Sequence, residues 1–100
     1  MQVMKRDDVL SRLRQHETDL RKLGVEGLYL FGSTARGEAG EGSDVDLFFD
    51  HERGALGLFD VMEVGERATR ILGRRADVMT RNSLHPRLRA DIEASALRVF

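Results

Sequence analysis

Two aspartates, Asp44 and Asp46, are the side chains of this sequence best suited to chemistry. From Asp44 the chain reads Asp-Val-Asp-Leu, and this alternation of polar and apolar residues is typical of a strand with one buried face. Successive strand side chains point to opposite faces, so the two carboxylates project together, roughly 7 Å apart, while Val45 and Leu47 point into the core. Such a pair repels unless a positive charge lies between its members. Mg²⁺ supplies that charge and commonly joins carboxylates to substrate phosphates, so the pattern predicts a magnesium site.

A third carboxylate, Asp77, lies in the short segment Ala-Asp-Val-Met-Thr at 76–80, which predicts another strand. A neighbouring strand could bring Asp77 beside the first pair. Three acids on one sheet face can hold two metal ions, one activating the attacking oxygen and the other steadying a departing pyrophosphate. We therefore predict Asp44, Asp46 and Asp77 as metal ligands and catalytic residues, one of which also accepts the nucleophile's proton.

Gly32 and Ser33 follow an apolar segment and have the residue types of a phosphate-binding turn. Glycine lets the backbone approach a ligand closely. Backbone N–H groups at a helix start, helped by the serine hydroxyl, then face a phosphate. Arg36 follows one turn later, and its planar guanidinium suits a pair of triphosphate oxygens.

The elements that must position these residues follow from hydrophobic periodicity and from glycine and proline positions. They are a helix over 7–23, a strand over 25–31, a glycine-rich loop over 37–43, a strand over 44–50, a helix over 58–72, a strand over 76–80, a helix over 86–95, and a tail at 97–100 that adds a strand or packs. The helix over 58–72 is expected to carry its apolar residues on one side: Phe59, Met62, Ala68, Ile71 and Leu72. This order favours an α/β (α+β) fold, a small mixed β-sheet flanked by helices.

Length and composition limit the alternatives. One hundred residues suit one domain over 1–100, and 41% hydrophobic with 33% charged residues is typical of a folded globular chain. The formal charge of −1 argues against a general polyanion-binding protein, so we expect no direct nucleic-acid binding. There is no cysteine, and no apolar stretch is long enough for a membrane span or a signal peptide. We expect a cytoplasmic protein without a membrane association.

Other candidate groups carry weaker signals. Residues 67–89 hold seven arginines and one acid, Asp77, so Arg74, Arg75 and Arg81 either line a wall that receives a triphosphate or an acidic partner, or form a solvated face. The three histidines lack metal-ligand spacing, and Ser33 lacks the Gly-x-Ser-x-Gly context of a hydrolase nucleophile.

The string Gly-Ser-x-Ala-Arg-Gly (32–37) followed by Ser-Asp-x-Asp-Leu (43–47) resembles the minimal nucleotidyltransferases (MNT) of the polymerase β-like nucleotidyltransferase superfamily. The resemblance implies that Gly32, Ser33, Arg36 and Ser43 bind the nucleotide and that Asp44, Asp46 and Asp77 hold Mg²⁺, with two ions expected and ATP as the donor.

Members of this family are often encoded beside a HEPN-domain protein in toxin–antitoxin pairs. The resemblance therefore implies a hetero-oligomer with a HEPN-domain toxin, and AMP transfer to a toxin hydroxyl, typically a tyrosine, that silences an RNase. A non-catalytic antitoxin that neutralises its partner by covering it is the main alternative, and a metal-binding structural domain that ignores ATP is another. Substituting Asp44 and Asp46 by Asn separates them: only an enzyme would lose neutralisation while complex formation persists.

Overall fold

The computed structural model of the chain describes residues 4–40, 42–52, 54 and 56–100. Its elements are, in chain order, α1 (Arg6–Gln15), α2 (Glu17–Lys22), β1 (Gly27–Phe31), α3 (Gly32–Ala35), β2 (Val45–Asp50), α4 (Leu58–Leu72), β3 (Ala76–Thr80), the 3₁₀ turn η1 (Arg81–Ser83), α5 (Arg89–Ser95) and β4 (Leu97–Arg98). The predicted mixed α/β fold is confirmed. None of the helices formed by these residues is long and apolar enough to cross a membrane.

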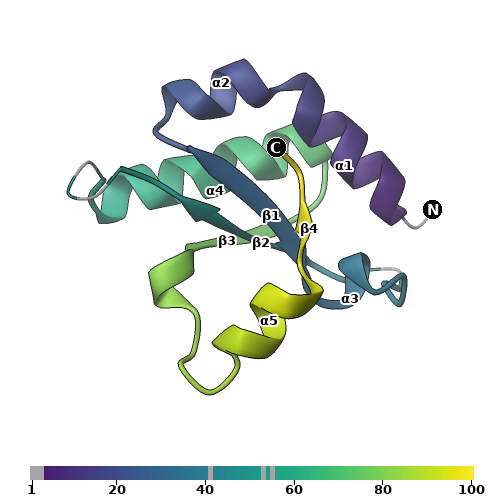
Figure 1. The fold of residues 1–100 in the computed structure, drawn as a ribbon. Helices are drawn as coiled ribbons and strands as arrows, with labels where there is room; N and C mark the ends of the chain where they lie inside the picture. The colour runs from purple at the N-terminus through teal and green to yellow at the C-terminus, as the bar shows by residue number, and fades with distance from the viewer. Residues whose placement is uncertain (1–3, 41, 53, 55) are drawn as a thin grey trace.

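The four strands form one mixed sheet in the order β3-β2-β1-β4. The two central strands, β1 and β2, run antiparallel, β3 joins β2 in parallel, and β4 joins β1 antiparallel (Figure 1). The chain can place β3 parallel to β2 because α4 lies between them in sequence and returns the chain to the same end of the sheet. The tail thus adds a strand, one of the two outcomes expected for it.

Helices α1, α2 and α4 cover one face of the sheet (Figure 1). The alternate strand residues that face them form the main core with the inward faces of these helices. Its fully buried members include Val9, Leu13, Leu20, Leu28, Leu30, Val45, Leu47, Phe49, Val64 and Leu72. The side chains between them along β1 and β2 project to the opposite face, where the predicted site residues lie.

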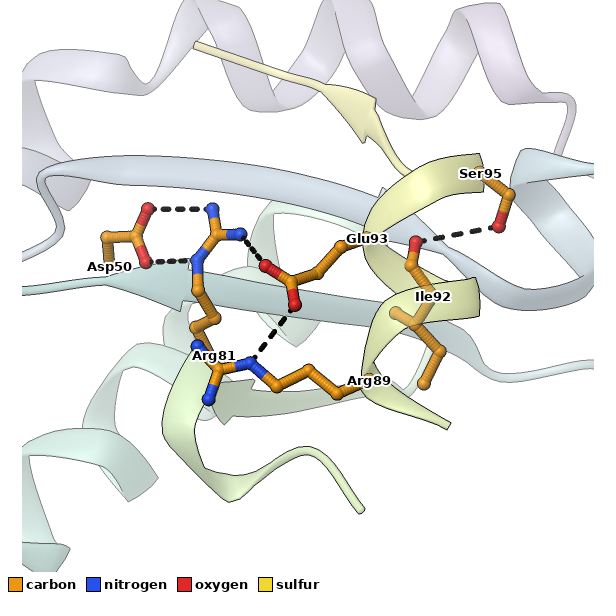
Figure 2. A network of polar contacts seen from close by, with 6 residues as sticks. All are labelled: Asp50, Arg81, Arg89, Ile92, Glu93 and Ser95. Atoms are coloured by element: carbon orange, nitrogen blue, oxygen red, sulfur yellow. Dashed lines mark hydrogen bonds and ion pairs between the residues drawn. The ribbon is translucent and has the colours of Figure 1, made fainter. Parts of the chain in front are cut away.

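The opposite face is partly covered by η1 and α5 (Figure 1). Phe48 is buried there, stacked on Tyr29 with ring centroids 4.9 Å apart. The Arg81 guanidinium lies over both rings, 4.8 Å from the Tyr29 centroid and 4.9 Å from that of Phe48. It donates to both carboxylate oxygens of Asp50 at 2.7 and 3.0 Å and to Glu93 at 2.5 Å, which ties α5 to the sheet (Figure 2).

Three predicted elements differ from the structure by more than one residue at a boundary or by a break. The predicted helix over 7–23 is two helices, because the His16 N–H bonds to the Leu13 carbonyl while its Nδ1 donates to the Arg12 carbonyl, replacing the α-helical bond. The first strand begins at Gly27 instead of residue 25, since the Val25 N–H bonds back to Leu20. The last helix begins at Arg89 instead of residue 86, after a turn closed on the His85 carbonyl.

The prediction of which residues form the apolar side of α4 is wrong for the first turns of the helix. Ala68 and Leu72 are buried as expected, with Val64 beside them. Phe59 and Met62, however, are 82% and 52% exposed. Val61 and Val64 take the inward positions of these turns instead, with Val61 packed against the core, so local periodicity predicted the helix but not the direction of its apolar face at the start.

Candidate active site

The parallel pairing of β2 with β3 brings the three predicted carboxylates together. Asp46 and Asp77 are direct register partners in this pair, and Asp44 precedes β2 by one residue on the same face. Burial raises the pKa of Asp46 above its ordinary value of 3.8, and the negative charges of Asp77 and then Asp44 raise it further, against a lowering by Arg36. The mutual repulsion that the sequence predicts for these acids is therefore present in the fold.

An arginine lies between two of these acids. Arg75 Nε is 3.8 Å from Asp44 Oδ2 and 3.7 Å from Asp77 Oδ1, while its side chain stays 75% exposed. The backbone of Arg75 is held by its carbonyl, which accepts the Val45 N–H at 3.0 Å. Its contacts with the acids are long and solvated, so the guanidinium can leave without breaking the strand pairing.

In this arrangement, with Arg75 between the carboxylates, no three His, Asp or Glu side chains of the described residues are grouped as ligands of a metal ion. The chemistry of the donor set nevertheless fits a hard divalent cation, because three carboxylates share one face and raise the pKa of Asp46. The assignment of Asp44, Asp46 and Asp77 as metal ligands stays a prediction.

Gly32 joins the predicted phosphate turn to the carboxylates. Its φ is +76°, and a Cβ at this position would lie 3.2 Å from Asp46 Cγ and would collide with a carboxylate oxygen of Asp46. Phe31, just before it, is the β1 register partner of Asp46. Glycine is therefore required here twice, for its backbone conformation and for the room that Asp46 occupies.

The rest of the Gly-Ser motif forms the four-residue helix α3 and the turn after it. The Ser33 carbonyl accepts the Glu38 N–H at 2.8 Å. Arg36 lies near enough to Asp46 to lower its pKa, but its Nε donates to Glu38 at 3.1 Å, and both side chains are exposed. A nucleotide phosphate at this turn would have to replace Glu38 as the partner of Arg36.

Ser43 lies at the other end of the glycine-rich loop and has local partners. Its hydroxyl accepts the Gly40 N–H at 3.0 Å, and its carbonyl accepts Arg74 Nη1 at 3.4 Å. These bonds hold the loop just before Asp44. Nucleotide binding by Ser43 stays a prediction.

Of the three candidate arginines, only Arg75 contacts the carboxylates among the described residues. Arg74 supports the loop through Ser43, and Arg81 lies beyond the far end of β3, about 13 Å along the strand from Asp77. Asp50 and Glu93 hold Arg81 against the ring of Phe48. Sequence alone could not choose among the three, since their directions depend on strand pairing.

Comparisons with known proteins place this chain in a family. The family model of the nucleotidyltransferase domain matches residues 13–99. The protein adenylyltransferase MntA of Thermococcus cleftensis is 36% identical over 85 residues, which cover 84% of this chain and 85% of that protein.

Solved structures agree. A structure assigned as a minimal nucleotidyltransferase aligns with a TM-score of 0.81 and 31% identity over 97% of this chain and 98% of the other. A chain from a structure of a tri-AMPylated Shewanella oneidensis HEPN toxin in complex with its MNT antitoxin shares the fold, with a TM-score of 0.65 and 16% identity over 91% of this chain and 71% of the other.

The family match, the identity to these relatives and the shared fold agree with one another. This chain belongs to the nucleotidyltransferase domain family and is a minimal nucleotidyltransferase.

Proposed function

We propose that this protein transfers AMP from Mg²⁺-bound ATP to a hydroxyl group of a partner protein, and that the partner is a HEPN-domain toxin silenced by the modification. The observation that carries the proposal is the meeting of Asp44, Asp46 and Asp77 on one sheet face, with Asp46 held against Gly32. The relative named as a protein adenylyltransferase supports a protein acceptor. The neighbour bound to an AMPylated HEPN toxin shares the fold and supports this class of partner.

The proposal gives the carboxylates and the Gly-Ser turn different binding roles. Asp44, Asp46 and Asp77 hold the divalent cation, which supplies charge neutralisation for the α-phosphate and the departing pyrophosphate. Arg75 gives up its contacts with Asp44 and Asp77 when the cation binds. The Gly32-Ser33 turn and Arg36 hold the triphosphate.

In the reaction, the acceptor hydroxyl oxygen forms a bond to the α-phosphorus of ATP. The bond from that phosphorus to the bridging oxygen breaks, and its electron pair leaves with pyrophosphate. We assign the hydroxyl proton to Asp77, because it lies on β3, a strand at the edge of the sheet that another protein can approach.

The test is the intact mass of the purified HEPN-domain partner after incubation with this protein, ATP and Mg²⁺. We expect whole AMP increments on the partner with the wild type and none with Asp44→Asn or Asp46→Asn. Asp91→Asn removes an exposed acid of α5 and serves as the matched control, which should transfer AMP normally.

No mass change with the wild type, while the complex still forms, would contradict the proposed activity. It would favour neutralisation of the partner by binding alone. Increments with Asp46→Asn equal to those with the wild type would instead contradict the assigned site.

A further inference from the structure

Three large apolar side chains are exposed together at the start of α4. Leu58 is 73% exposed, Phe59 82% and Met62 52%. Leu88 is the other large apolar side chain of the described residues with comparable exposure, at 53%, and it lies in the turn before α5. A cluster of this kind on one helix turn is typical of a surface that binds another protein.

Leu58 and Met62 of this cluster line a groove of about 780 Å³ between α4 and β3. Leu58, Val61 and Met62 line one part of it, and Arg75 and Asp77 line the part next to the carboxylates. The apolar surface is therefore continuous with the candidate active site.

One wall of this groove is a sheet edge. Among the described strands β3 pairs only with β2, so the outer side of β3 presents backbone groups to solvent. An extended segment can add to such an edge as a further strand, with backbone hydrogen bonds giving affinity and alternate side chains giving specificity. The side chains of a strand alternate between its two faces. A segment paired with β3 would therefore direct every second side chain toward the groove beside α4, and the side chains between them toward the face of Asp77.

Charge in the groove limits what the segment can be. Arg70 and Arg75 line the groove, and so do the acids Glu66 and Asp77, so its charged side chains are of both signs. A bound segment with an acidic side chain for Arg70 and a basic side chain for Glu66 would complement the charges of this groove.

We propose that this groove binds an extended segment of the acceptor protein, which pairs with β3 and presents its hydroxyl residue to Asp77. The segment carries apolar side chains for Leu58 and Met62, an acidic side chain for Arg70 and a basic side chain for Glu66. The inference rests on the proposed function for the identity of the acceptor, and it adds the surface and the mode of binding.

The test compares L58S/M62S with the wild type and with Leu88→Ser, which removes an apolar side chain about as exposed as Met62 elsewhere on the surface. We expect L58S/M62S to weaken binding of the purified HEPN-domain partner about tenfold or more, because anchors of this type dominate interface energies. Its affinity for Mg²⁺ and AMP-PNP should stay within about twofold of the wild type, since the nucleotide turn is untouched. Leu88→Ser should change neither affinity.

A second measurement is hydrogen exchange of the wild type with and without the partner, which should slow at the β3 amides on binding. Unchanged partner affinity in L58S/M62S, or protection outside α4 and β3, would overturn the proposal. So would loss of self-association as the sole effect of L58S/M62S, because the groove would then hold a second copy of this chain.

The two proposals can fail separately. Protection of β3 by a partner that gains no AMP would reject the activity and leave the groove assignment standing. AMP transfer by L58S/M62S with an unchanged KM for the partner would reject the groove and leave the activity standing.

Discussion

Asp46 and Gly32 depend on each other. The carboxylate of Asp46 occupies the space that a side chain at position 32 would need, and the φ of +76° at Gly32 directs the chain from β1 into α3. The glycine of the motif therefore both shapes the phosphate turn and sets the position of an acid. Replacing Gly32 therefore tests both its left-handed backbone conformation and its close approach to Asp46.

We expect Gly32→Ala to lower the free energy of unfolding and to abolish AMP transfer, because the new Cβ must displace Asp46. Gly37→Ala is the matched control: its φ is +73°, and nothing lies within 4 Å of its Cβ position. The control should lose only the conformational cost, about 1–2 kcal/mol. Urea unfolding and intact-mass assays measure both effects, and equal behaviour of the two variants would show that the contact with Asp46 is unimportant.

Among the elements, α5 is joined to the sheet by polar contacts. It has no buried residue of its own, and Glu93 is its main link to Arg81, with Arg89 donating to the same carboxylate at 3.0 Å (Figure 2). Arg81 in turn is bidentate to Asp50 and stacks on two aromatic rings. A planar guanidinium is needed to make all these contacts at once.

Arg81→Lys keeps the charge but loses the bidentate and stacking contacts, so we expect the free energy of unfolding to fall by about 1–3 kcal/mol. Arg87→Lys, at an exposed position of the turn before α5, should change it by less than about 0.5 kcal/mol. Affinity for Mg²⁺ and AMP-PNP should be unchanged in both, since this network lies at the opposite end of β3 from Asp77. Equal stability of the two variants in urea would contradict the structural role of Arg81.

For the molecule as a whole, one face of the sheet forms the core and the other carries the candidate site. One face buries the apolar side chains of β1 and β2 under α1, α2 and α4 and supplies most of the stabilisation. The other face concentrates three negative charges, and the raised pKa of Asp46 shows that the fold opposes its ionisation. The core therefore offsets a destabilising charge cluster, as is common for functional sites.

Asp46→Asn should raise the melting temperature of the metal-free protein at pH 7 while abolishing transfer. A raised pKa means that the folded state binds the proton more tightly than the unfolded state does. The ionisation of Asp46 therefore lowers the stability of the folded state as the pH rises from 3.8, the ordinary pKa of the group, through its raised folded-state pKa. Above the folded-state pKa this loss of stability is constant.

The difference between wild type and Asp46→Asn in thermal unfolding should accordingly vanish below pH 3.8. Asp91→Asn, at an exposed position of α5, provides the comparison for loss of one negative charge. A lower melting temperature of Asp46→Asn at pH 7 would contradict the repulsion.

Local sequence pattern was enough for most elements and for the grouping of Asp44 with Asp46. The alternation of β2 separates Val45 and Leu47 from the two acids, and Gly73, with a φ of 65°, ends α4 at the predicted residue. The Gly-Ser and Asp-x-Asp motifs were sufficient to predict the family. These features depend on neighbours within one or two turns, whose geometry the residue types control.

Only the tertiary structure could decide which distant residues meet. The register that sets Asp77 beside Asp46 comes from strand pairing across 31 positions, and the choice of Arg75 over Arg81 as the arginine at the acids follows from it. The exposure of Phe59 and Met62 depends on which side of α4 faces the sheet, where Val61 and Val64 lie instead. Such features arise from packing between segments far apart in the chain, and no periodicity within one segment contains that information.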